Sequence, residues 1–149
     1  MPIGEICNRA VVFAKKDISL LEAAQLMRQN HVGDVVIVDE KNGRRIPVGI
    51  VTDRDIVIEV IAKGIDINTV TASDIMSAGV AMARETEGVF ETIQLMRLKG
   101  VRRMPVVDAH GGLVGIVSVD DLVELLAEEM NELAKLISRE QVRETKTRK

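Results

Sequence analysis

The chain contains two copies of one sequence pattern, and this internal repeat constrains the fold more than any single motif does. The segment QLMR at residues 25–28 returns at residues 94–97, and GIV at residues 49–51 returns at residues 115–117. The offset between the copies shortens only across a predicted Gly-containing turn in each copy. Because turns tolerate insertions, the sequence predicts two copies of one structural unit.

Each copy has the same order of predicted elements, β-α-β-β-α. Apolar residues at helical spacing indicate the helices, and β-branched runs separated by a turn indicate a hairpin. Gly64 is the expected C-cap of the first closing helix. The elements are expected at residues 10–13, 20–27, 35–38, 47–51 and 55–63 in the first copy, and at 79–82, 89–96, 104–107, 113–117 and from 121 onward in the second. The predicted class is a mixed α/β (α+β) fold.

The chain divides into three predicted parts. They are repeat 1 at residues 1–68, repeat 2 at 69–128, and a C-terminal helical extension with a basic tail at 129–149. Residues 65–72 are the predicted linker between the repeats. In the extension, Met130, Leu133 and Ile137 lie three or four residues apart, so one helix face is apolar. We expect this stripe to mediate self-association rather than packing on its own domain, and we expect fraying from Arg139 onward.

Composition argues against several classes of function. With 46% hydrophobic and 29% charged residues, the chain has the balance of a globular, soluble protein. The net charge of −3 disfavours a duplex-binding surface, and two Phe without Tyr or Trp leave little to stack single-stranded bases. The lone Cys7 suits a reducing cytoplasm, and no apolar stretch fits a signal peptide or a membrane span. We therefore expect a cytoplasmic protein with no membrane or nucleic-acid partner.

The strand-to-helix junction GIVTDRD at residues 49–55 returns as GIVSVDD at residues 115–121. In each copy a Thr or Ser precedes an Asp by three residues, which is the pattern of a helix capping box. The same position also suits a ligand, because N–H groups at a helix start bind phosphate. Arg102 and Arg103 precede the partner strand in repeat 2, where guanidinium groups can meet an anion. Both interpretations, capping and ligand binding, stay open from the residues alone.

Metal and catalytic sites find little support. His31 and His110 lie far apart on predicted loops, and Cys7 is the only thiol, so no metal-ligand spacing appears. The acidic residues at the two closing helices are explained by the helix dipole, and no nucleophile can be paired with a His. We expect no metal, no catalytic residues and no enzyme activity.

The order of these motifs resembles a tandem pair of CBS domains, the Bateman module. The matching segments are the QLMR helices, Asp74-Ile75-Met76, Met104-Pro105-Val106-Val107-Asp108 and the two junctions, and together they span about residues 6 to 128. The resemblance implies a stand-alone pair of repeats packed about a pseudo-two-fold axis. It also implies a homodimer, since family pairs commonly associate into a flat disc of four repeats.

The resemblance further implies an adenosine-containing ligand, AMP, ADP, ATP or S-adenosylmethionine, in a cleft between the repeats. The family's Asp takes the ribose hydroxyls, as the acid of dinucleotide folds does, and its Thr or Ser lies near the phosphates. These roles would fall on Asp121 with Ser118 and on Asp55 with Thr52. The opening segment of the opposite repeat would complete each site: Ile6, Cys7 and Ala10 for the second junction, and Ile75, Ser77 and Val80 for the first.

The two predicted sites differ in charge. Arg103 aligns with Asp34, and Arg102 aligns with Gly33. A basic residue here is a frequent phosphate contact in the family, so we expect the Ser118/Asp121 site to prefer phosphorylated ligands. The Thr52/Asp55 site is expected to be weak, to be empty or to depend on Arg54.

The sequence therefore predicts a non-catalytic regulatory module that senses an adenosine nucleotide and acts on an unidentified partner protein. The alternatives are a structural or protein-interaction module with empty clefts, an S-adenosylmethionine binder, or a nucleic-acid binder. A rise in melting temperature with ligand separates binding from a purely structural role.

Overall fold

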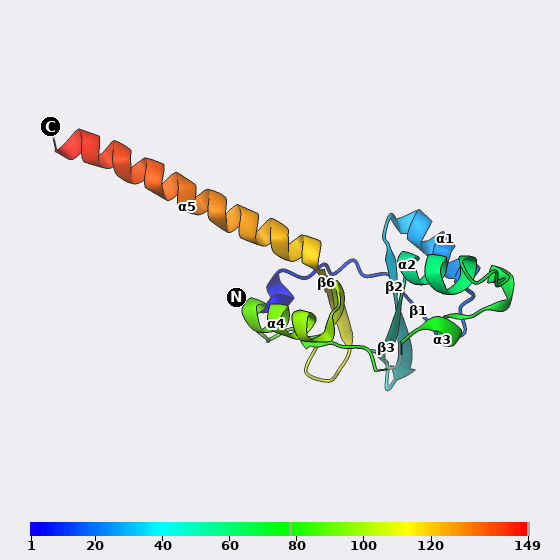
Figure 1. The fold of residues 1–149 in the computed structure, drawn as a ribbon. Helices are drawn as coiled ribbons and strands as arrows, with labels where there is room; N and C mark the ends of the chain where they lie inside the picture. The colour runs from blue at the N-terminus through cyan, green and yellow to red at the C-terminus, as the bar shows by residue number, and fades with distance from the viewer. Residues whose placement is uncertain (78, 149) are drawn as a thin grey trace. The chain divides into compact units, whose positions relative to one another are not determined.

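The computed structural model describes residues 1–77 and 79–148. By their contacts these residues divide into two compact units, Met1–Val117 and Ser118–Lys149. The first unit holds the two three-stranded sheets, and the second consists mainly of the C-terminal helix, α5 (Val119–Thr147) (Figure 1). None of the described helices is both long and apolar enough to cross a lipid bilayer.

The first sheet combines a parallel and an antiparallel pairing. Its strands, in spatial order, are β1 (Phe13–Ala14), β2 (Asp34–Lys41) and β3 (Arg44–Thr52). β1 runs parallel to β2, whereas β2 and β3 form an antiparallel hairpin. The hairpin register shifts between Ile37 and Val38, where Val38 pairs with Pro47. A bulge at this point accommodates the proline, which cannot donate to a ladder.

Among the helices of the first copy, α1 (Leu20–Asn30) begins and ends at residues whose local geometry explains its boundaries. The helices are η1 (Ile3–Glu5), α1, α2 (Asp53–Ile56) and the π-helical turn η2 (Val57–Ile61). Ser19 caps α1, because its Oγ accepts a hydrogen bond of 3.1 Å from the backbone N–H of Glu22. α1 stops at His31, which takes a left-handed φ of 54°.

The second copy repeats this order. Its elements are η3 (Ile67–Thr69), α3 (Ala72–Ile75), β4 (Ala83–Arg84), α4 (Val89–Lys99), β5 (Arg103–Val107) and β6 (Leu113–Ser118), followed by α5. The sheet order is β4-β5-β6, and β4 is parallel to β5 as β1 is to β2. α4 ends at Gly100 with a φ of 66°, the position equivalent to His31. The predicted mixed α+β class with a C-terminal helix is confirmed.

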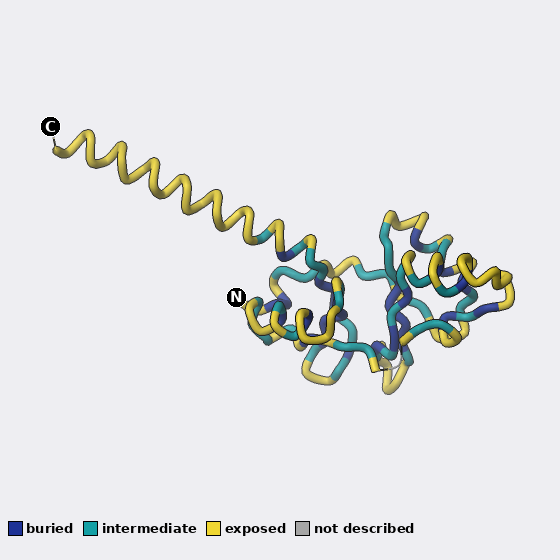
Figure 2. The backbone as a smooth tube through the Cα atoms, viewed as in Figure 1, coloured by how far each residue is buried: buried dark blue, intermediate teal, exposed yellow. Residues whose placement is uncertain are grey.

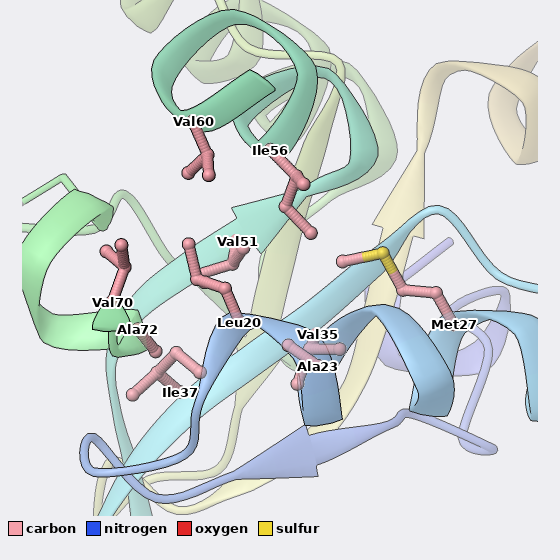
Figure 3. Close-up of a cluster of buried hydrophobic side chains, with 10 residues drawn as sticks. All are labelled: Leu20, Ala23, Met27, Val35, Ile37, Val51, Ile56, Val60, Val70 and Ala72. Atoms are coloured by element: carbon pink, nitrogen blue, oxygen red, sulfur yellow. The ribbon is translucent and has the colours of Figure 1, made fainter. Parts of the chain in front are cut away.

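Strand β2 is covered on both faces, which explains its run of four buried residues, Val35 to Val38. Val35 and Ile37 pack in a core beneath α1 and α2 (Figure 3). The buried members of that core are Leu20, Ala23, Met27, Val35, Ile37, Val51, Ile56, Val60, Val70 and Ala72. Val36 and Val38 point the other way and pack with Ile116 of the second sheet. β2 therefore joins the two copies into one packed unit.

The opening segment of each copy packs on the opposite copy. The N–H of Ile3 donates to the carbonyl of Glu87 at 2.7 Å, and the N–H of Ala72 donates to the carbonyl of Ile18 at 2.9 Å. Ile3 and Ala72 are equivalent positions of the repeat, and both are fully buried. The two copies thus exchange their first residues, which ties them together by backbone hydrogen bonds as well as by apolar contacts.

Several predicted boundaries were wrong. The strands expected at residues 10–13 and 79–82 lie later, as the two-residue strands β1 and β4. The expected linker, residues 65–72, is structured, since it contains η3 and contributes Val70 and Ala72 to the core of repeat 1. α5 continues to Thr147, well past the point where fraying was expected.

Candidate ligand site

The first junction, residues 52–55, is a capping box. The Oγ1 of Thr52 accepts from the N–H of Asp55 at 3.1 Å, and Oδ2 of Asp55 accepts from the N–H of Thr52 at 2.9 Å. The prediction of a cap is confirmed. Only one carboxylate oxygen of Asp55 takes part in this reciprocal pair, and a carboxylate has about four acceptor sites, so capping does not use up the group.

The second junction, residues 118–121, has the same geometry at the start of α5. The Oγ of Ser118 accepts from the N–H of Asp121 at 3.2 Å, and Oδ2 of Asp121 accepts from the N–H of Ser118 at 3.0 Å. The two junctions are therefore equivalent in bonding as well as in sequence.

A third capping box, which sequence reasoning did not single out, joins Thr71 and Asp74. The Oδ2 of Asp74 accepts from the N–H of Thr71 at 2.9 Å, as at the two junctions. Its signal was present in the sequence as Thr-x-x-Asp, but it follows no strand of either sheet. The motif alone is thus not specific for a ligand site, and its place at the end of β3 or β6 is what distinguishes the two junctions.

The glycines that open the two GIV segments allow a close approach of the opposite copy. A Cβ added at Gly49 would lie 2.5 Å from Sδ of Met76. A Cβ at Gly115 would lie 2.7 Å from Sγ of Cys7 and 2.8 Å from the backbone oxygen of Asn8. Met76 and Cys7 are equivalent positions of the repeat, so the same contact occurs in both copies. Only glycine fits without a shift of its neighbours.

Backbone hydrogen bonds fix one of these contacts. The N–H of Asn8 donates to the carbonyl of Ile116 at 2.8 Å, and the N–H of Ile116 donates to the carbonyl of Asn8 at 2.9 Å. Cys7 is half-buried beside this bridge, and its Sγ lies 3.6 Å from the carbonyl oxygen of Gly4. The structure therefore brings Cys7 and Asn8 to β6, the strand that leads to the second junction, whereas Ile6 is half-buried and Ala10 is exposed.

The corresponding segment of repeat 2 lies against repeat 1. Ile75 and Met76 pack on the core of repeat 1, and Met76 lies against Gly49 in β3, the strand that leads to Thr52. Val80 is half-buried, whereas Ser77 is exposed. Met76 lies within the segment from Ile75 to Val80 that was expected at the first junction, and it aligns with Cys7 of the first copy.

Arg103 reaches from β5 to the first copy. Its Nε lies 3.1 Å from Oδ2 of Asp34, and its Nη1 donates to the carbonyl of Gly33 at 3.2 Å. The same carbonyl accepts from the N–H of Asp53 at 3.0 Å, at the start of α2. Arg103 and Asp34 are aligned positions of the repeat, so this ion pair joins equivalent places in the two copies.

The electrostatic setting of Arg103 is therefore mixed. The side chain of Asp34 is 14% exposed and that of Arg103 is 29% exposed, so the pair is only partly open to water. The described contacts of the guanidinium use two of its five N–H donors. The sequence assigned this guanidinium to the second junction, and the structure places it beside Gly33, next to the first residue of α2. Arg54 and Arg102 are exposed.

One acid with a perturbed pKa, Asp108, lies outside these junctions. Hydrogen bonds from the backbone N–H groups of Gly112 and His110 lower the pKa of Asp108, which closes the turn between β5 and β6. Among the described residues, no three His, Cys, Asp or Glu side chains lie close enough together to hold a metal ion. What the junctions offer is a carboxylate and a hydroxyl at each helix start, with a guanidinium near the first.

Comparison with known proteins identifies relatives of this arrangement. A family model of the CBS domain matches residues 3–62 and again residues 72–128. The chain is 41% identical over 123 residues to an uncharacterised protein of Methanopyrus kandleri, covering 83% of this chain and 61% of that protein. It is 34% identical over 124 residues to hypoxic response protein 1 of Mycobacterium tuberculosis, covering 83% and 84% of the two chains.

Solved structures also include proteins with CBS domains among the similar folds. The CBS domain pair of protein MJ0100, in complex with 5-methylthioadenosine and S-adenosyl-L-methionine, matches with a TM-score of 0.75 and 29% identity over 87% of this chain and 98% of that one. Hypoxic response protein 1 with two coordinated zinc ions matches with a TM-score of 0.71 and 32% identity over 83% and 98%.

Proposed function

Because the chain belongs to the CBS domain family and carries two copies of the domain, we propose that it is a non-catalytic regulatory module that binds adenosine-containing ligands. Tandem CBS pairs are regulatory ligand-binding modules as a class. The observation that carries the proposal is the repeated junction, in which an Asp–Thr or Asp–Ser cap ends a strand that the opposite copy approaches closely.

The two junction carboxylates, Asp55 and Asp121, are the proposed ribose contacts. The cap holds one oxygen of each carboxylate, and the other oxygen would accept from the ribose diol, as the acid of dinucleotide folds does. Thr52 and Ser118 hold these carboxylates in place. The solved CBS pair with bound 5-methylthioadenosine and S-adenosyl-L-methionine supports an adenosine moiety as the common feature.

For the opposite face of the ligand we propose the exchanged segments. Ile6, Cys7 and Ala10 would serve the second junction, and Ile75, Ser77 and Val80 would serve the first. These residues offer aliphatic and backbone groups rather than aromatic rings, which suits an adenine held by its edges and by apolar contact.

Arg103 is the proposed phosphate contact, with Arg102 and Arg54 as further cations near the junctions. Its bond to Asp34 competes with a phosphate for the same guanidinium. We therefore propose that AMP, ADP or ATP binds with Arg103 shared between phosphate and Asp34, whereas an unphosphorylated adenosine leaves the ion pair intact.

A second candidate is a structural or interaction module with empty clefts. The third capping box, at Thr71 and Asp74, favours it, because it shows that this chain uses the same bonding where only a helix start is needed. In either case we propose a cytoplasmic homodimer that acts on a partner protein.

Thermal unfolding with AMP, ADP, ATP, NAD, 5-methylthioadenosine and S-adenosylmethionine tests the proposal. At a hundred times its Kd, a ligand adds about 2.7 kcal/mol to the free energy of unfolding, which raises the Tm by roughly 5–11 °C for a chain of this size. We expect such a rise with at least one of these compounds. An unchanged Tm with all of them would favour the structural role.

A further inference from the structure

Helix α5 carries a continuous apolar stripe that the described structure leaves exposed. Val123 is 59% exposed, Met130 67% and Ile137 58%, with Leu126 and Leu133 between them at 52% and 56%. Figure 2 shows the helix as exposed along nearly all of its length. Soluble proteins rarely leave an apolar surface of this extent without a partner, so α5 is a candidate interface.

The spacing of the stripe identifies the kind of partner. The five residues follow one another at alternating intervals of three and four, which is the seven-residue pattern of a helix that packs along another helix. Ala127 and Ala134 flank the stripe, and such small side chains allow a close approach. α1 and α4, at 11 residues each, are far shorter than the 29 residues of α5. A second copy of α5 matches the stripe in length.

The charges of α5 distinguish the two possible directions of pairing. Its first half is acidic and its second half mainly basic: Asp120, Asp121, Glu124, Glu128, Glu129 and Glu132 precede Lys135, Arg139, Arg143 and Lys146, with Glu140 and Glu144 as exceptions. In a parallel pair each acidic residue would lie beside the same acidic residue of the second helix, which is repulsive. In an antiparallel pair the acidic half of one helix lies along the basic half of the other, which is attractive.

One antiparallel register satisfies the apolar residues and the charges together. If Met130 packs against Leu133 of the second copy, Leu126 packs against Ile137 and the reverse contacts follow by symmetry. Glu124 then lies level with Arg139, and Glu128 lies level with Lys135 of the second copy. Glu140, which falls opposite Val123, marks the end of the stripe. β-branched residues alternating with Leu also suit a parallel pair, and the charges decide against it.

We propose that α5 pairs with α5 of a second copy in antiparallel orientation and so assembles two CBS pairs through their C-terminal helices. This interface deepens the proposed homodimer and does not depend on ligand binding at the junctions, so its failure would leave the proposed ligand binding untouched.

The test compares Leu133→Glu with Val142→Glu in the full chain. Leu133 lies on the stripe, and Val142 is an apolar residue of the same helix, 47% exposed, on the outer face. We expect a dimeric mass by sedimentation for the wild-type chain and for Val142→Glu, and at least a tenfold higher dimer Kd for Leu133→Glu. Circular dichroism checks that both variants stay folded. A wild-type monomer, or a dimer unaffected by Leu133→Glu, overturns the proposal.

Disulfide trapping in a Cys7→Ser background tests the direction. Leu126→Cys combined with Ile137→Cys should cross-link two copies under oxidation, because these positions meet only in the antiparallel register. Leu126→Cys alone should not cross-link. Efficient cross-linking of that single variant would establish a parallel pair and overturn the antiparallel assignment.

Discussion

At the scale of single residues, Gly49 and Gly115 show why the junction motif begins with glycine. Neither has a left-handed φ, so the requirement is for space and not for an unusual backbone conformation. The opposite copy fills the place where a Cβ would stand. At Gly49 the nearest atom to the added Cβ is Sδ of the flexible Met76 side chain. At Gly115 the backbone oxygen of Asn8, at 2.8 Å, is nearly as close to the added Cβ as Sγ of Cys7, at 2.7 Å.

We expect Gly115→Ala to destabilise the fold more than Gly49→Ala. Overpacking of this kind costs about 1–3 kcal/mol, and a backbone oxygen cannot move aside as a thioether can. Urea unfolding of the two variants measures the difference in free energy of unfolding. An equal loss, or a greater loss for Gly49→Ala, would show that the close approach at Gly115 is not rigid.

The Arg103–Asp34 pair makes a second residue-scale prediction. Replacing Asp34 by Asn removes the competing charge, so Kd for AMP should fall by about fivefold, a change of ~1 kcal/mol, while Kd for adenosine stays the same. Arg103→Ala should raise the Kd for AMP and again leave the Kd for adenosine unchanged. Calorimetric titration of both ligands separates these effects. If the Kd values for AMP and adenosine change together, the ion pair affects binding through the fold and not through a contact with phosphate.

At the scale of elements, the sequence predicted those parts that depend on local pattern. The QLMR helices, the two hairpins and the capped junctions have short-range signals in spacing and capping residues. β1 and β4 do not, because a two-residue strand exists only by pairing with β2 or β5. The sequence pattern indicated a linker at Val70 and Ala72, because the residues that they pack against belong to repeat 1 and are distant in the sequence.

Strand β2 yields a prediction at this scale. Ile37 is fully buried beneath α1, whereas Ile61 at the end of η2 is 63% exposed. Ile37→Ala should lower the free energy of unfolding by about 2–5 kcal/mol, and Ile61→Ala, which deletes the same atoms, by about 0.5 kcal/mol or less. Chemical denaturation measures both. Similar losses would mean that Ile37 does not belong to the core of repeat 1.

At the scale of the whole molecule, the exchange of opening segments joins the two repeats by backbone hydrogen bonds. Each GIV segment is contacted by the opening segment of the other copy, through Met76 at Gly49 and through Cys7 and Asn8 at Gly115. Sequence alignment predicted the pairing of segments through the family resemblance. It did not predict that the aligned residues Arg103 and Asp34 bond to each other, because an alignment compares equivalent positions and says nothing of contact between them.

Ligand titration of matched Asp→Asn variants tests the central claim most directly. Asn keeps an oxygen for the cap but loses the charge and acceptor capacity needed for a ribose diol. Calorimetry with the best ligand from thermal screening should show at least a tenfold loss of affinity in the Asp55→Asn/Asp121→Asn double variant. Asp74→Asn, which alters the third capping box, should bind as the wild type does. Full affinity in the double variant would contradict the assignment of the junctions as the ligand site.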